Sequence, residues 1–135
     1  MTDHLRTLTE HECIELLSTT TVGRVAFVNA AGLQLIPLNF AMIDSEIYFR
    51  TATDSILDDL ADGMDDVAFG VDHHSESSRD GWNVTVKGAT SRVSDPALYA
   101  HVMSWSRLHP WAGGQRGVVI HLLITSIEGR RVHGA

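Results

Sequence analysis

The chain has 135 residues, 44% of them hydrophobic, which is enough for a single domain over 1–135 that buries its own core without metals or disulfides. Its formal net charge is −7 at pH 7 and Lys87 is its only lysine, so most of the surface should repel a nucleic acid. Polar residues interrupt every apolar stretch well before the roughly 20 residues that span a bilayer, so we expect no membrane partner. The first residues contain no basic or apolar segment of a secretion signal, which predicts a cytoplasmic protein.

Cys13 is the only cysteine, and this excludes an internal disulfide framework and a site with several thiolate ligands in one chain. It lies on the apolar stripe of a predicted helix, together with Leu16 and Leu17. We therefore interpret it as a buried structural thiol rather than a nucleophile.

The first predicted element is an amphipathic helix that begins with the capping box Thr9–Glu12 and runs to Leu17. Further on, helical patterns are expected over Asp54–Asp62, which Gly63 ends, and from Pro96 to Trp105. Runs rich in β-branched and aromatic residues predict the strands Val22–Asn29, Leu33–Ile43, Glu46–Thr51, Asp66–Asp72, Gly81–Val93, Val118–Ile124 and Ser126–Val132.

Two details refine this pattern. Pro37 cannot donate a backbone hydrogen bond, so its strand should be edge-like or bulged there.

The segment His73–Asp80 is polar and is expected to form a loop. His73 and His74 are neighbours and cannot easily share a metal ion, so no metal site is predicted. Strands joined mostly by short turns indicate a β-dominated α+β fold: a six-stranded antiparallel barrel with short helices at its ends.

Five blocks of the sequence together resemble the pyridoxamine 5'-phosphate oxidase-like, or flavin/deazaflavin oxidoreductase, family. They are Val22–Phe27, Ile36–Phe40, Ile47–Thr51, Gly81–Gly88 and Ile127–Val132, in an order and spacing that cover nearly the whole chain. The resemblance implies an FMN-binding split β-barrel that forms a homodimer, with the flavin in a groove between the subunits.

The resemblance places the flavin phosphate near Arg50 and Thr51. A guanidinium recognises phosphate in a bidentate manner, and the hydroxyl of Ser55 could add a further hydrogen bond. Arg116 is the second cation that the resemblance suggests for this role. The alternatives are a solvated charge for Arg50, a helix cap for Thr51 and Ser55, and a surface salt bridge for Arg116.

The same resemblance brings Pro37, Leu38 and Asn39 to the isoalloxazine ring, where backbone amides and the Asn side chain would meet its polar edge. Trp82 could cover a flat ligand or seal the interface between two copies, and the two readings are equally weighted. Trp111 lies in a stretch that would complete the groove, although packing in an interface is the commoner role for such a residue.

One departure from the family pattern concerns the phosphate. Many relatives have a lysine after the serine at the helix start, whereas this chain has Ile56, and Asp54, Asp58 and Asp59 are close by. We therefore expect an FMN-dependent oxidoreductase that acts on an unknown small molecule, with no protein acid or base identified. The alternative is a non-catalytic dimer that binds F420 or haem, or a barrel without a cofactor.

Overall fold

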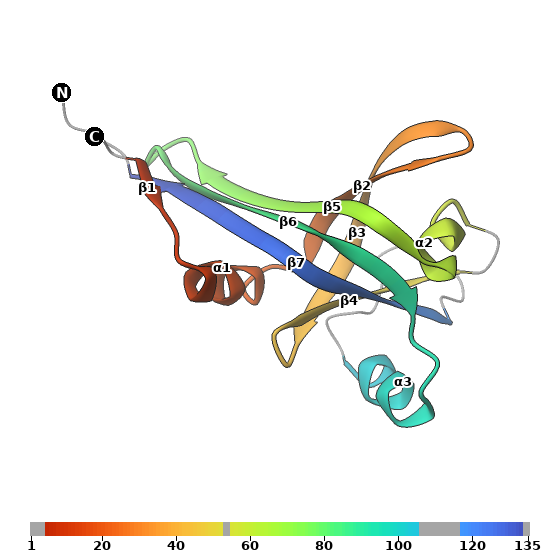
Figure 1. Cartoon of the computed structure of the whole chain (residues 1–135). Coiled ribbons are helices and arrows are strands. Elements are labelled where there is room, and N and C mark those ends of the chain that lie inside the picture. The colour runs from red at the N-terminus through yellow and green to blue at the C-terminus, as the bar shows by residue number, and fades with distance from the viewer. Residues whose placement is uncertain (1–4, 53–54, 106–116, 134–135) are drawn as a thin grey trace.

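The computed structural model describes residues 5–52, 55–105 and 117–133, and its helices and strands are labelled in Figure 1. The elements in chain order are β1 (Leu5–Thr7), α1 (Glu10–Leu17), β2 (Val22–Asn29), β3 (Gly32–Ile43), β4 (Glu46–Thr51), α2 (Asp58–Asp62), β5 (Met64–Ser75), β6 (Asp80–Arg92), α3 (Pro96–Met103) and β7 (Val118–Val132).

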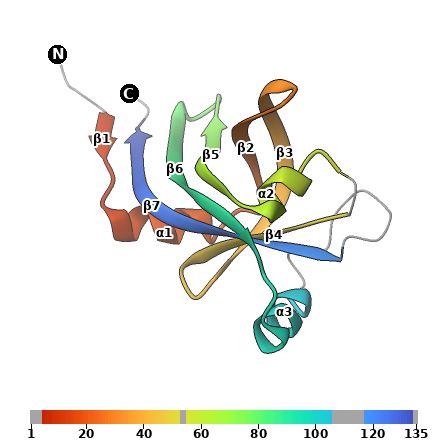
Figure 2. The same cartoon turned by 45° about the vertical axis from the view of Figure 1, so that its right-hand side comes forward.

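The strands form one antiparallel sheet in the order β1-β7-β4-β3-β2-β5-β6, and a further pairing of β6 with β7 closes it. Six of the strands thus make a ring, while β1 is added at the outer end of β7 (Figures 1 and 2). The predicted β-dominated split barrel is confirmed: its ring has the six strands expected, and β1 is a further strand outside the ring. None of the helices in the described ranges is long and apolar enough to cross a membrane.

Several predicted boundaries differ from the structure. Strand β1 was not predicted, because its three exposed residues carry no hydrophobic pattern. Helix α2 has five residues and begins only at Asp58. The polar loop expected over His73–Asp80 is present but shorter, as a turn over residues 76–79. Strand β5 continues to Ser75 and β6 begins at Asp80, so the two histidines lie in a strand and not in the loop.

The predicted break between two C-terminal strands is instead a β-bulge within the single strand β7. Lys87 of β6 pairs with Ser126 and Gly88 pairs with Ile124, which leaves Thr125 as the extra residue. The Thr125 hydroxyl donates to the Lys87 carbonyl at 2.9 Å. This bulge lets one 15-residue strand bend and stay paired with β6 along its length.

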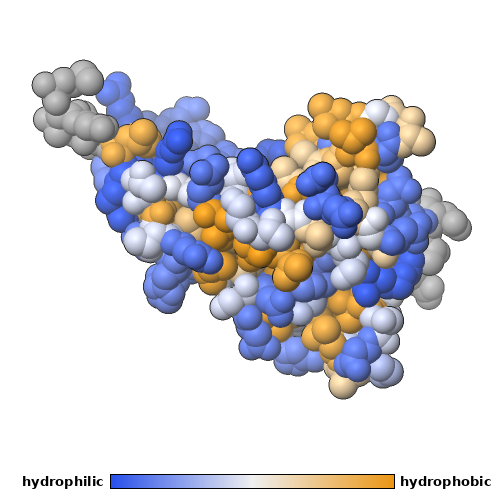
Figure 3. Space-filling model, in the orientation of Figure 1, coloured by the Kyte–Doolittle hydropathy of each residue, from blue (hydrophilic) through white to orange (hydrophobic). Residues whose placement is uncertain are grey.

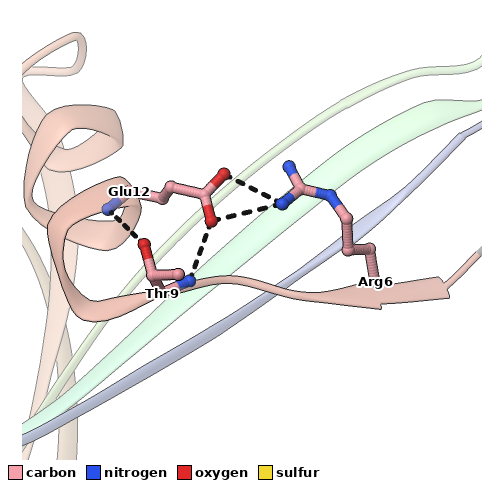
Figure 4. A network of polar contacts seen from close by, with 3 residues as sticks. All are labelled: Arg6, Thr9 and Glu12. Atoms are coloured by element: carbon pink, nitrogen blue, oxygen red, sulfur yellow. Dashed lines mark hydrogen bonds and ion pairs between the residues drawn. The ribbon is translucent and has the colours of Figure 1, made fainter.

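Helix α1 begins with the predicted capping box. The Thr9 hydroxyl accepts from the Glu12 N–H at 3.1 Å, and the Glu12 carboxylate accepts from the Thr9 N–H at 2.9 Å (Figure 4). Arg6 of β1 donates to the same carboxylate at 2.9 Å, which ties the strand to the helix. The helix turns Cys13 into the core, where the thiol is fully buried as expected.

The main core fills the barrel. Phe40 and Phe69 pack edge to face with ring centroids 5.0 Å apart, and Phe49 is fully buried beside them. A second, smaller core lies between α3 and the outward face of β3, β4 and β7, and consists of Ala41, Ile43, Tyr48, Val93, Val102 and Val119. The β3 and β4 strands therefore have an inward face toward the main core and an outward face that α3 covers at one end.

Candidate functional site

Strand β3 divides the three residues predicted to lie near a flavin ring between its two faces. Leu38 points inward and packs against the main core. Asn39 is on the outward face with Ala41, and Pro37 is also outward because side chains alternate along a strand. The part of β3 around Pro37 pairs with β2, and its recorded pairing with β4 begins only at Phe40. This matches the edge-like position expected of the proline.

Strand β4 separates Arg50 from Thr51 in the same way. Phe49 and Thr51 face inward, whereas Tyr48 and Arg50 face outward. Phe40 and Phe49 are cross-strand partners, and Asn39 and Arg50 are the next residues along the two strands. The outward face therefore brings Asn39 and Arg50 to the same place, with Arg50 half-buried.

Thr51 is fully buried, and its hydroxyl lies 2.7 Å from the hydroxyl of Ser55. Ser55 in turn accepts a hydrogen bond from the Leu57 N–H at 3.1 Å. The two hydroxyls thus form a pair that fixes the turn before α2. Ser55 is partly exposed, whereas Thr51 is buried. Ser55 could therefore contact a ligand, and Thr51 would hold Ser55 in position.

The turn before α2 carries little positive potential. Ile56 is 48% exposed there, and Asp58 and Asp59 begin the helix. A helix of five residues has a weak dipole, and two carboxylates in its first turn oppose an anion. Among the predicted phosphate ligands in the described part of the chain, Arg50 is the one cation.

Trp82 lies far from Arg50 within one chain. Trp82 pairs with Arg131 and Arg50 pairs with Val119, and these partners are twelve residues apart in β7, about 40 Å along the strand. Trp82 is largely buried and its ring centroid is 6.3 Å from that of His73. Trp111 and Arg116, the remaining predicted site residues, lie outside the described residues.

A groove that the sequence did not predict runs over the outward face of β2, β5 and β6. Its volume is about 380 Å³. Small residues of neighbouring strands form part of its floor, and Arg24 and Asp72 lie at its edge, joined by an ion pair of 3.2 Å. The groove is lined by Arg24, Ala26, Leu35, Ala68, Phe69, Gly70, Val71, Asp72, Asn83, Val84 and Thr85. The available signal in the sequence was Ala68 and Gly70, which alternate in β5, together with Ala26 of β2, but the pairing of these two strands had to be known first.

The β2–β3 hairpin beside this groove is apolar and exposed. Val28 and Leu33 are cross-strand partners near its tip, exposed by 61% and 78%, and Leu35 is two residues further along on the same face. Figure 3 shows hydrophobic surface gathered over the hairpin at the upper right. Exposed apolar patches of this kind mark surfaces that bind another molecule.

The sequence matches the family model described as pyridoxamine 5'-phosphate oxidase over residues 9–131. The chain belongs to this family. Uncharacterized protein Rv0080 of Mycobacterium tuberculosis is 30% identical to it over 129 residues, which cover 93% of this chain and 84% of Rv0080.

Solved structures of other proteins have the same fold. A Corynebacterium glutamicum protein whose name also refers to pyridoxamine 5'-phosphate oxidase superposes with a TM-score of 0.84, at 24% identity and over 100% of this chain and 98% of that one. An FAD binding protein from Mycobacterium smegmatis superposes with a TM-score of 0.77, at 28% identity and over 94% and 98% of the two chains.

Proposed function

We propose that this member of the pyridoxamine 5'-phosphate oxidase family is a flavin-dependent oxidoreductase that uses FMN and acts on a small molecule in the cytoplasm. The observation that carries the proposal is the convergence of Arg50 and Asn39 on the outward face of β3 and β4. An FAD binding protein among the similar structures supports a flavin in general. The flavin, when bound, supplies the hydride and electron chemistry.

The residues of the chain would bind and orient this cofactor. Arg50 would hold the phosphate through charge-assisted hydrogen bonds, with Ser55 as a second donor that Thr51 keeps in place. Asn39 and the backbone of Pro37 and Leu38 would meet the polar edge of the ring, since the Leu38 side chain packs inward.

We further propose that the protein works as a homodimer. Trp82 lies too far along the barrel to reach a flavin held by Arg50 of the same chain, so only a second copy could bring it there. The exposed side chains of Val28, Leu33 and Leu35 give the second copy an apolar surface to cover. Under this proposal Trp82 would complete the groove between the subunits from the second copy, and Trp111 and Arg116 would complete it from either subunit.

One observation favours a second candidate function. Exposed Ile56 and the carboxylates of Asp58 and Asp59 make the region next to Arg50 unfavourable for a doubly charged phosphate. A non-catalytic dimer that binds F420 or haem in the groove between the subunits would be consistent with this. The absorption spectrum of the purified protein distinguishes these two cofactors from FMN.

Fluorescence titration of FMN tests the proposal. The wild-type protein should quench FMN fluorescence, and Arg50→Gln should weaken binding about tenfold or more, because a hydrogen bond to a charged group contributes about 1.5–3 kcal/mol. Arg92→Gln is the matched control, since Arg92 makes a surface ion pair with Asp62 at 3.8 Å. Tighter binding of FAD than of FMN would show that FAD, and not FMN, is the preferred cofactor. A wild-type protein that quenches neither would contradict the proposed function.

A further inference from the structure

Two hydrogen bonds attach the segment around α3 to the first residues of β7. The Tyr99 hydroxyl, on α3, donates to the Gly117 carbonyl at 2.5 Å. The Val93 N–H, between β6 and α3, donates to the Val119 carbonyl at 2.9 Å. In Figures 1 and 2, α3 accordingly lies below β4 and β7. The segment thus holds the chain on both sides of Val118.

The residues of β7 that this segment holds are the partners of the proposed phosphate ligands. Val118 pairs with Thr51. Val119 pairs with Arg50, and these two pairs are the last that β4 makes with β7. Pairs at the end of a ladder open more easily than those in its middle. A contact that holds the start of β7 therefore also holds the end of β4, where Arg50 and Thr51 lie.

The position of the Tyr99 hydroxyl is itself fixed by the packing and capping of α3. Val102 of α3 and Val119 of β7 are fully buried in the smaller core, and Tyr99 packs against the same core. At the start of the helix, the Asp95 carboxylate accepts from the Leu98 N–H at 2.9 Å. Tyr99 follows directly, so its hydroxyl reaches β7 from a helix that is anchored at its beginning and along its buried side.

We propose that Tyr99 is a positioning residue for the flavin phosphate. Its hydroxyl fixes the start of β7, and this keeps Arg50 and the hydroxyl pair of Thr51 and Ser55 in the arrangement that binds the phosphate. Tyr99 acts through β7 and β4 and does not itself contact the cofactor. This role rests on the proposed function, because it requires a phosphate bound by Arg50.

Fluorescence titration with FMN and with riboflavin, which has the same ring system without the phosphate, tests this role. Tyr99→Phe removes only the hydroxyl and should weaken FMN binding about two- to fivefold, as expected for one neutral hydrogen bond. The Kd of riboflavin should change less than about 1.5-fold. In the Arg50→Gln background, Tyr99→Phe should cause no further loss of FMN affinity, because both substitutions act on the same interaction.

Tyr48→Phe is the matched control, because it removes the same group from the same small core. Burial, and then the nearby carboxylates of Glu46 and Asp44, raise the pKa of the Tyr48 hydroxyl. That hydroxyl therefore lies toward the beginning of β4, away from Arg50. Tyr48→Phe should leave the Kd of FMN within about 1.5-fold of the wild-type value.

The outcomes separate the role of Tyr99 from the proposed function. An unchanged Kd of FMN in Tyr99→Phe would overturn this role, and so would equal weakening of FMN and riboflavin. Equal weakening of FMN binding by Tyr48→Phe, or a full further loss in the Arg50→Gln background, would overturn it as well. In all of these cases, FMN binding by the wild type leaves the proposed function standing. A wild-type protein that binds neither FMN nor FAD removes the proposed function and the role of Tyr99 together.

Discussion

At the scale of single residues, Glu12 shows how a short sequence motif fixes local structure. The Thr9 N–H, and then Arg6, donate to its carboxylate and hold the pKa of Glu12 below its ordinary value. The capping box was predictable because its two residues are three apart in the sequence. The contact with Arg6 was not, because it depends on β1, whose partner β7 is at the other end of the chain.

The Glu12 pKa leads to a prediction for pH dependence. A carboxyl whose pKa is lower in the folded than in the unfolded state contributes stability above its unfolded pKa, near 4.5, and loses it as the pH falls through the folded pKa. Glu12→Gln should therefore lower Tm at pH 7 and make little difference in strong acid. Thermal unfolding of both proteins from pH 7 to pH 2.5 checks this. A Tm difference that stays constant over the whole range would contradict it.

Residues of the candidate site were predictable by type but not by side-chain direction. The Arg50–Thr51 pair is recognisable in the sequence, yet alternation along β4 points the two side chains to opposite faces. Thr51 became a buried partner of Ser55 as a result. Which face is inward depends on the pairing with β3 and β7, and the sequence of β4 alone does not contain that pairing.

At the scale of elements, the bulge in β7 explains why one continuous strand was predicted as two. The hydrophobic pattern changes phase at Thr125, and this was interpreted as the boundary between two strands. In the structure the extra residue changes the phase while the strand continues, because β6 remains paired on both sides of it. Gly88 lies opposite the bulge, where a Cβ would collide with the Leu123 carbonyl oxygen.

Gly88→Ala should therefore be strongly destabilising. The added methyl group meets backbone rather than a flexible side chain, so β6 and β7 must separate locally, and we expect a loss of about 2 kcal/mol or more and a decrease in Tm of several degrees. Gly70→Ala in β5 is the matched control, since its nearest contact would be 4.0 Å away. Equal Tm values for the two variants would show that the close approach at Gly88 has no energetic consequence.

At the scale of the whole molecule, the barrel separates residues that a shared site requires. Arg50 of β4 and Trp82 of β6 pair with opposite ends of β7, and the sequence could not reveal this because strand order and register are long-range properties. The same strand order exposes the apolar tip of the β2–β3 hairpin. Both features support the proposal that the partner is a second copy of the chain.

Leu33→Glu should weaken the proposed dimer. A carboxylate at the most exposed apolar position of the hairpin would have to lose its water on association, which is unfavourable without a partner charge. Sedimentation velocity at micromolar concentration should show a dimer for the wild type and a larger monomer fraction for the variant. Leu123→Glu, at an exposed leucine of β7, is the control. A variant as dimeric as the wild type would exclude the hairpin from the interface.

Native mass spectrometry of the purified protein tests the central claim most directly, because it reports the number of chains and the bound cofactor in one spectrum. We predict a species of two chains that carries up to two flavin molecules, and loss of the flavin in Arg50→Gln while the dimer persists. A single chain without flavin, in a preparation supplemented with FMN and FAD, would contradict it.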